Sequence, residues 1–246
     1  MNNLLAVLSF LTIIPTKDYD LMYIAKNMYL FPIAGLIIGS IIGLLSFLPI
    51  NEMILASIIV LGLLIITGAH HIDGLADFAD ALMVKGSKEV KKRVIHDPAT
   101  GSAGVSAIVI YFICSIIALS SISNNQLYLS IIVSEVLAKF SMVLLAYTGR
   151  SAWEGMGSIF INIVDLKRFL IGLILTIIIV YTLASLEGFY ALILSIITTL
   201  SILKIAERSF GGISGDVFGA TNEIIRVVNF ILFVHLNIRT SFIDII

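Results

Sequence analysis

Apolar runs of about twenty residues alternate with short polar segments along this chain, and that length crosses the hydrocarbon core of a bilayer. We expect transmembrane helices at about 28–48, 53–69, 103–121, 127–147, 169–186 and 189–205. A turn at Glu187-Gly188 separates the last two runs. A final apolar stretch reaches about residue 238, and its polar breaks leave open whether it spans or re-enters. The segment 3–14 is too short to span and ends at Pro15, which predicts an interfacial or re-entrant helix.

Composition supports the same fold class. The chain is 59% hydrophobic and 13% charged, with a mean hydropathy of +1.09, whereas a soluble domain is about a quarter charged. We therefore predict one domain over residues 1–246, an all-α, polytopic integral membrane bundle of about six or seven transmembrane helices. The net charge of −1 excludes the basic footprint of a nucleic-acid partner. The single cysteine, Cys114, lies in an apolar run and has no partner for an internal disulfide.

The distribution of Lys and Arg predicts the topology. Connectors without these residues are 49–52, 122–126 and 187–188, and connectors rich in them are 15–27, 83–102, 148–168 and 204–216. The two kinds alternate, so the positive-inside bias places the basic connectors in the cytoplasm. The motifs described next all fall on that side, whereas a transporter more often has its polar groups near the bilayer midplane. We expect an enzyme of the cell membrane with its active site facing the cytoplasm.

Three glycines in the first expected span also predict packing. Gly35, Gly39 and Gly43 recur every four residues, which would let another helix approach closely. Frequent glycine is also a general feature of membrane helices, so the spacing alone leaves both interpretations open.

The segment from His70 to Asp80 carries three carboxylates just after an apolar run. Asp73, Asp77 and Asp80 have i, i+4, i+7 spacing, which places them on one face of an α-helix. Like charges so arranged repel one another unless a cation lies between them, and Mg²⁺ prefers such oxygen ligands. A helix dipole would favour one Asp near an N-terminus, but it does not account for three. Gly74 would let a backbone or a phosphate come close.

Two neighbouring features are less specific. His70 and His71 fit either a phosphate contact or proton relay, or an ordinary interfacial hydrogen bond. Asp97, Gly101 and Gly104 precede an expected helix, where glycine-rich backbone offers N–H groups to phosphate. The same residue types also build ordinary loops.

The fourth expected span contains ionisable residues. Glu135 and Lys139 lie one helical turn apart, and a structural ion pair and the lining of a substrate cavity are both open. Arg150, at the cytoplasmic end of the same run, is suited to bidentate phosphate binding.

A second acidic motif begins after Arg208. Asp216 and Glu223 are seven residues apart and share a helical face, next to the amide of Asn222. The glycines of this stretch are Gly211, Gly212, Gly215 and Gly219. Two acidic faces, basic residues and glycine-rich loops on one membrane face are suited to holding Mg²⁺ and a diphosphate during phosphoryl transfer.

These residues resemble the cobalamin synthase (adenosylcobinamide-GDP ribazoletransferase) family. The matching segments are Phe10 to Pro15, Phe31 to Gly35, His71 to Asp80 as His-x-Asp-Gly-Leu-Ala-Asp-x-Ala-Asp, Asp97 with Gly101 and Gly104, and Gly211 to Glu223 as Gly-Gly-x-x-Gly-Asp-x-x-Gly-Ala-x-Asn-Glu. The chain departs from the family at Ala81, where Gly is common, and at Lys139, where Arg is frequent.

The resemblance implies a Mg²⁺-dependent transfer of the cobinamide phosphate of adenosylcobinamide-GDP to α-ribazole, with GMP leaving. This is a phosphotransferase step, the last of cobalamin nucleotide-loop assembly. Asp73, Asp77 and Asp80 would be the main metal ligands. Asp216 and Glu223 would be a second metal-binding face or the base, and a carboxylate or His71 would take the proton. The expected substrate-binding residues are His70, Gly74, Asp97, Gly101, Gly104, Lys139, Arg150, Arg208, Gly211, Gly212, Gly215 and Asn222. Membrane lipid would surround the protein, and an oligomer is compatible with the sequence.

Two rival functions rank behind this one. A CDP-alcohol phosphotransferase also uses carboxylates and Mg²⁺, but its motif continues Asp-Gly-x-x-Ala-Arg, where this chain has Asp77-Phe78. A non-catalytic transporter would distribute ionisable residues through the bilayer depth, and Glu135 and Lys139 are its only support.

Overall fold

The computed structural model describes residues 2–14 and 19–236. Apart from one isolated β-bridge, every regular element in these ranges is a helix. The helices are α1 (Asn2–Leu11), α2 (Leu21–Lys26), α3 (Phe31–Gly43), α4 (Glu52–Ile66), α5 (His70–Met83), α6 (Lys88–Ile95), α7 (Ser102–Ser121), α8 (Asn124–Thr148), α9 (Met156–Ile163), α10 (Leu166–Phe210) and α11 (Gly215–His235). Short 3₁₀ turns, η1 (Met28–Leu30) and η2 (Leu44–Phe47), flank α3. Pro15 and the residues beyond 236 in the last expected stretch lie outside the described ranges.

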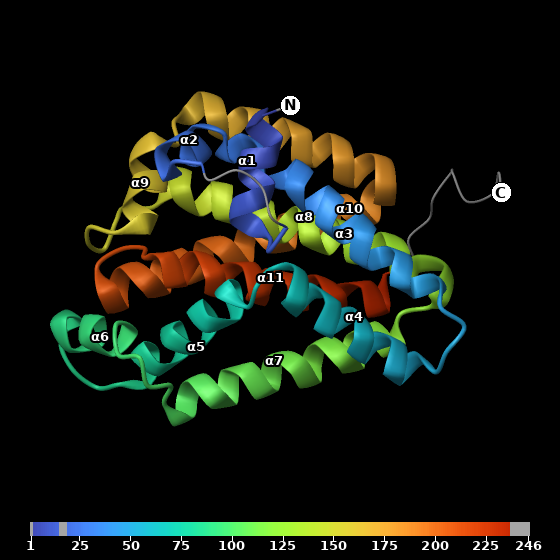
Figure 1. The fold of residues 1–246 in the computed structure, drawn as a ribbon, viewed down its shortest axis with the longest axis horizontal. Helices are drawn as coiled ribbons and strands as arrows, with labels where there is room; N and C mark the ends of the chain where they lie inside the picture. Colours follow the sequence, from blue (N-terminus) through green and yellow to red (C-terminus); the bar gives the residue numbers. More distant parts are fainter. Residues whose placement is uncertain (1, 15–18, 237–246) are drawn as a thin grey trace.

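The all-α membrane fold is confirmed. In the described part of the chain, five helical segments are long and apolar enough to cross a membrane, and the bent pair of α4 and α5 would make a sixth. The protein is therefore a multi-pass membrane protein. In Figure 1, the short helices α2, α6 and α9 lie at one end of the bundle, and the α3–α4 and α7–α8 connections lie at the other. The ends of the bundle thus differ in Lys and Arg: α6 and α9 flank connectors rich in them, and the α3–α4 and α7–α8 connections at the other end have none.

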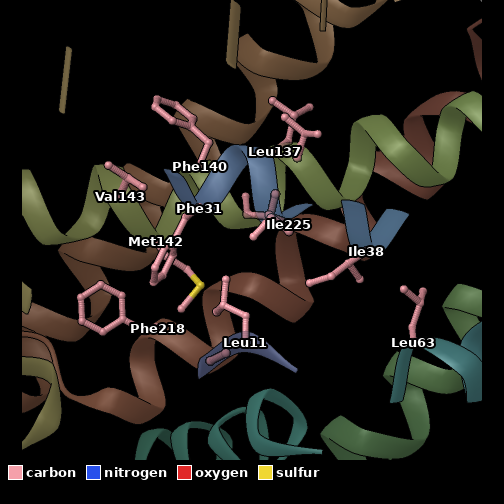
Figure 2. Close-up of a cluster of buried hydrophobic side chains, with 14 of the residues drawn as sticks. Leu11, Phe31, Ile38, Leu63, Leu137, Phe140, Met142, Val143, Phe218 and Ile225 are labelled. Carbon is pink, nitrogen blue, oxygen red and sulfur yellow. The ribbon is translucent and has the colours of Figure 1, made fainter. Parts of the chain in front are cut away.

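Helix α8 lies at the centre of the bundle, with α3, α10 and α11 packed around it (Figure 1). All side chains from Ser130 to Ala146 are buried, which is the pattern of a helix that contacts protein on every side. Figure 2 shows part of the surrounding core, where side chains of α8 such as Phe140 and Met142 lie among those of α1, α3 and α11.

The glycines of α3 pack directly on α8, as their spacing predicts. A Cβ atom added to Gly35 would lie 2.6 Å from the carbonyl oxygen of Glu135, and one added to Gly39 would lie 2.7 Å from the Cα of Ile132. At Gly43 it would lie 2.8 Å from the ring of Tyr128. The two backbones therefore approach more closely than any side chain at these positions would permit.

The outer helices present apolar side chains to the surroundings. On α7, exposed side chains recur every fourth residue at Val105, Val109, Ile113 and Ile117. This stripe runs along one helix face, away from the core, and is suited to contact with lipid chains.

The second expected span, 53–69, corresponds to α4 except for its last three residues, where the chain bends. Helix α4 ends at Ile66 and is about 22 Å long, which is short for a bilayer, and α5 leaves it at an angle of 93°. Gly68 (φ 65°) and Ala69 (φ 61°) both adopt the left-handed conformation, which ends α4 and redirects the chain. The motif helix α5 therefore enters the bundle at a steep angle to α4.

The turn expected at Glu187-Gly188 lies a few residues earlier in the structure, so its predicted position is wrong. Residues 187 and 188 are helical, and the break lies at Ala184 and Ser185, where Ser185 has φ 47°. Gly188 lies against the carbonyl of Val180, whereas eight residues of straight helix would separate them by about 12 Å. Helix α10 is therefore two arms folded back on each other, because a small residue at 188 lets the second arm pass the first.

The N-terminal helix α1 is about 15 Å long, as a non-spanning segment should be. It buries Ala6, Val7 and Leu11, and the N–H of Ile13 donates to the carbonyl of Ile66 at 2.9 Å. The segment before the first span is thereby fixed to the end of α4.

Candidate active site

Two glycines bring the two acidic motifs into direct contact. A Cβ atom on Gly74 of α5 would lie 2.9 Å from the carbonyl oxygen of Asp216, and one on Gly219 of α11 would lie 3.1 Å from the carbonyl oxygen of His71. The helices α5 and α11 therefore cross backbone against backbone. A backbone or a phosphate was expected to come close to Gly74, and in the structure the backbone of Asp216 does so.

The crossing gathers four carboxylates. Asp73 is exposed, and Asp77, Asp80 and Asp216 are partly buried. Asp73, Asp216 and Asp80 are the acidic groups near enough to Asp77 to oppose its charge, in that order of strength. Within the described residues, none of the four forms an ion pair with Lys or Arg. The crossing is therefore a site of uncompensated negative charge.

Asp80 differs from its neighbours because its carboxylate already accepts two hydrogen bonds. The N–H groups of Gly101 and Gly104 donate to it at 2.7 and 2.8 Å, at the start of α7. A Cβ atom at either glycine would collide with the Asp80 carboxylate. The carboxylate of Asp97 accepts the N–H of Ala99 at 3.0 Å and is exposed. In this structure the glycine motif binds a protein carboxylate, and its phosphate-binding role stays a prediction.

A second polar group is fully buried between α7, α8 and α11. Arg226 is 1% exposed and donates to Glu135 through Nε and to Glu223 through Nη1. Its Nη1 also donates to the Tyr111 hydroxyl at 2.9 Å. Neither Arg226 nor Tyr111 was among the residues expected to form the site. The available signal was a lone Arg within an apolar run, three residues after Glu223.

Lys139 and Asn222 complete this buried network. Lys139 Nζ donates to Asn222 Oδ1 at 2.6 Å and lies 3.8 Å from Glu135 Oε2, and Asn222 Nδ2 donates to Glu223 Oε1 at 3.0 Å. Lys139 and Glu135 are both 0% exposed. Of the two interpretations left open for Glu135 and Lys139, the structure shows the ion pair. The substrate-binding roles expected for Lys139 and Asn222 stay predictions.

His71 connects the buried network to a cavity. Its Nδ1 lies 3.9 Å from Glu223 Oε1 and has no hydrogen-bond partner in the structure. The same residue lines a cavity of about 590 Å³ between α1, α3, α5, α8, α9 and α11. Of the residues expected to form the site, His70, His71, Gly215 and Asp216 line this cavity.

The remaining wall of the cavity was not predicted. It includes Phe10 from α1, Phe31 from α3, Met142 from α8, Phe160 from α9 and Phe218 from α11. These residues read as ordinary core positions along the sequence, because only tertiary packing shows that they surround a space.

The rim of the cavity carries aromatic and basic groups. The His96 ring meets the Trp153 ring edge-on at 5.4 Å, and Lys92 Nζ lies 5.4 Å from the centre of the same Trp153 ring. Cation–π contacts of this kind hold an aromatic side chain in place at an exposed site.

Arg150 lies on a neighbouring loop, and Arg208 is exposed near it on α10. Arg150 Nε donates to the Gly211 carbonyl at 3.0 Å. The Ile213 N–H donates to the Arg150 carbonyl at 2.8 Å, and the Ala152 N–H donates to the Ile213 carbonyl at 3.0 Å.

Gly212 fits against the backbone of residues 150–152, and Gly211 ends α10 with φ 88°. These glycines join two loops beside the cavity. The Arg150 side chain stays 70% exposed.

The acidic crossing matches the chemistry of a Mg²⁺ site with few protein ligands. The described residues contain no group of three or more His, Cys, Asp or Glu side chains placed to hold a metal by themselves. Mg²⁺ usually keeps several waters and is bound by one or two carboxylates together with substrate phosphates. Asp73, Asp77 and Asp216 supply enough carboxylates for a Mg²⁺ site of this kind, which needs only one or two of them.

The chain is similar to known proteins over almost its whole length. The model of the family described as cobalamin-5-phosphate synthase matches residues 3–234. The adenosylcobinamide-GDP ribazoletransferase of Archaeoglobus fulgidus is 35% identical over 219 residues, which cover 88% of this chain and 90% of the relative.

Proteins of the same name from Methanococcoides burtonii and Clostridium tetani are 32% and 31% identical. These matches cover 83% and 95% of this chain and 80% and 96% of the relatives. No solved structure matches the chain. The chain therefore belongs to the cobalamin-5-phosphate synthase family and is a transferase of cobalamin biosynthesis.

Proposed function

We propose that this protein transfers the cobinamide phosphate of adenosylcobinamide-GDP to α-ribazole in a Mg²⁺-dependent reaction that releases GMP. The names of the relatives support the two substrates. The observation that carries the proposal is the crossing of α5 and α11, where Asp73, Asp77 and Asp216 lie together without a basic partner. Such a site requires a cation, and a diphosphate substrate supplies further oxygen ligands for it.

The reaction exchanges one bond to phosphorus for another. The ribazole hydroxyl oxygen bonds to the phosphorus that carries cobinamide, the bridging P–O bond to GMP breaks, and the hydroxyl proton passes to a base. We assign the base to His71, which lines the cavity. Glu223 would orient His71 through Nδ1, because Arg226 and Asn222 hold the Glu223 carboxylate in place.

We assign the metal to Asp73, Asp77 and Asp216. When bound, Mg²⁺ would neutralise the diphosphate and stabilise charge on the departing phosphate. Asp80 and Glu223 also stood among the expected ligands. Their carboxylates accept hydrogen bonds from Gly101 and Gly104 and from Asn222 and Arg226, so we propose that these two position the site.

Basic residues at the same end would attract the anionic donor. Arg150 and Arg208 are exposed there, as are Lys92 and Arg93 of α6. By the positive-inside bias, this end of the bundle (Figure 1) would lie on the cytoplasmic side of the cell membrane.

Membranes containing the protein test the proposal. They would receive Mg²⁺, adenosylcobinamide-GDP and α-ribazole, with Asp73→Asn and Asp216→Asn alongside and Glu52→Gln as a matched control. Glu52 is an exposed acid at the start of α4, at the other end of the bundle. We expect cobalamin and GMP from the wild type and the control, and a loss of about 10²–10³-fold in both Asp variants.

Two further arms define the reaction. Chelation of Mg²⁺ should abolish turnover, and a CDP-alcohol donor should give no product. Full activity in either Asp variant would remove that residue from the mechanism. Absence of product from folded wild type would refute the proposed reaction.

A further inference from the structure

The cavity beside the acidic crossing has two chemically different ends. Toward α5 and the start of α11 it is polar, lined by His70, His71 and Asp216. The rest of the lining is mostly apolar and comes from helices distant in sequence, with Ser9, His96, Glu154 and Ser158 as polar members. A ligand that fills this cavity therefore needs one polar part and one apolar part.

The apolar end is built from an aromatic cluster. The Phe160 ring lies 5.2 Å from Phe10, 6.2 Å from Phe31 and 6.4 Å from Phe218, measured between ring centres. Met142 adds a flexible thioether to the same wall. These rings contact one another directly, so together they form an aromatic wall against which a flat, polarisable ligand ring can stack or place its edge.

The volume limits which substrate fits. About 590 Å³ suits a ligand of drug size, and therefore a single nucleoside, not a complete corrinoid with its nucleotide. Between the two nucleosides of the proposed reaction, guanosine carries donors and acceptors along its base edge. Phe and Met side chains would leave those groups unpaired, which costs binding free energy. The base of α-ribazole is a benzimidazole, which carries no such groups on its six-membered ring.

We propose that this cavity is the acceptor site, in which the flat, apolar aromatic base of α-ribazole lies among Phe10, Phe31, Phe160 and Phe218, and its ribose faces His71 and Asp216. The assignment rests on the proposed function. It places the acceptor hydroxyl next to the base and the metal site, and the donor outside the cavity near the basic rim. The 5′-phosphate of α-ribazole would use the same base pocket.

Trp153 reports binding directly, because it is the single tryptophan of the chain and lines this cavity. Purified protein would be titrated with α-ribazole and, separately, with guanosine, in the absence of the donor. We expect a saturable change of tryptophan fluorescence with α-ribazole and at least about tenfold weaker binding of guanosine. Equal responses to both nucleosides, or no response to α-ribazole because lipid fills the cavity, would overturn the assignment.

Gly215 provides a steric test. It lines the cavity, and a Cβ atom added there meets no atom within 4 Å, so a leucine at this position is tolerated at its Cβ and would occupy cavity space with its remaining atoms. We expect the KM for α-ribazole to rise at least about tenfold, while the KM for adenosylcobinamide-GDP changes less than about twofold. Ser106→Leu is the control, because Ser106 is exposed on α7 and away from the cavity.

A second variant covers the case in which Gly215→Leu does not fold. Phe10→Leu removes one ring from the wall and should weaken α-ribazole binding in the fluorescence titration without changing donor affinity. Unchanged α-ribazole affinity in folded variants would refute the acceptor site and leave the proposed reaction standing. Tight α-ribazole binding without turnover would support the cavity assignment and refute the reaction.

Discussion

Two carboxylates of α11 have opposite surroundings, although seven residues of helix separate them by only about 10 Å. Glu223 is 2% exposed and is held by Arg226 and Asn222, with Glu135 and Lys139 in the same network. Asp216 lies at the cavity, is partly buried, and receives one hydrogen bond from Ser214 at 3.0 Å.

The difference separates structural charge from functional charge. In the buried network two acids face two bases, so the protein neutralises its own charge in a region where unpaired charge is costly. At the crossing, Asp73, Asp77 and Asp216 lack such partners within the described residues, so neutralisation depends on something bound from solution.

The largest expected effect is on the buried side. Arg226→Met would leave Glu135 and Glu223 without their shared cation, and we expect a loss of about 3–5 kcal/mol in unfolding free energy. Thermal unfolding of the detergent-solubilised protein measures it. Arg93→Met, an exposed Arg of α6, is the matched control and should leave the midpoint in place. An unchanged midpoint in Arg226→Met would show that the network is not structural.

The second expected effect is on the open side. Mg²⁺ at about 100 times its dissociation constant should stabilise the wild type by about 2.7 kcal/mol, because it binds only the folded carboxylate cluster. The double variant Asp73→Asn with Asp77→Asn should lose this gain, and without Mg²⁺ its midpoint should equal or exceed that of the wild type because two mutually repelling charges are removed. The same unfolding assay with and without MgCl₂ decides the matter, and an equal Mg²⁺ shift in both proteins would place the metal elsewhere.

The third effect concerns the contact that joins the two motifs. Gly74→Ala would force α5 away from α11, since its Cβ atom meets the Asp216 backbone at 2.9 Å, and we expect a cost of about 1–3 kcal/mol with a loss of turnover. In the control Gly62→Ala, the nearest atom is the end of the flexible Ile42 side chain at 3.1 Å. That variant should retain both stability and turnover. Wild-type turnover in Gly74→Ala would show that the close crossing is unnecessary.

The smallest effect separates Asp80 from its neighbours. Asp80→Asn keeps one acceptor oxygen for the start of α7, so we expect a cost of about 1 kcal/mol and substantial remaining turnover. Asp77→Asn should lose most turnover in the same assay. If Asp80→Asn were as inactive as Asp77→Asn, Asp80 would belong with the metal ligands.

Much of the fold follows from local patterns. The apolar runs locate α7 and α8 to within a few residues, the four-residue glycine spacing identifies the face of α3 that packs on α8, and the spacing of Asp73, Asp77 and Asp80 predicts the helix α5. These features depend on periodicity, which neighbouring residues determine.

Other features depend on tertiary context. Nothing in Gly68-Ala69 requires two left-handed residues, so the bend between α4 and α5 was not predicted. Ser185 carries no turn signal, so the bend of α10 was placed at Glu187-Gly188, three residues too late. The pairing of Glu135 with Arg226 joins residues 91 positions apart, and spacing does not encode it. The cavity depends on six helices meeting, so its aromatic wall reads along the sequence as ordinary core.

The position of Arg226 also bears on how the chain is made. Ribosomes add about 5–20 residues per second, so Arg226 is synthesised roughly 5–18 s after Glu135. During that interval α8 enters the membrane with a carboxylate whose final partner does not yet exist. Lys139, one turn away at 3.8 Å, lies on the same helix as Glu135 and is the basic side chain available to it during that interval. Pairing with this lysine would lower the cost of the Glu135 carboxylate in the membrane until α11 is synthesised.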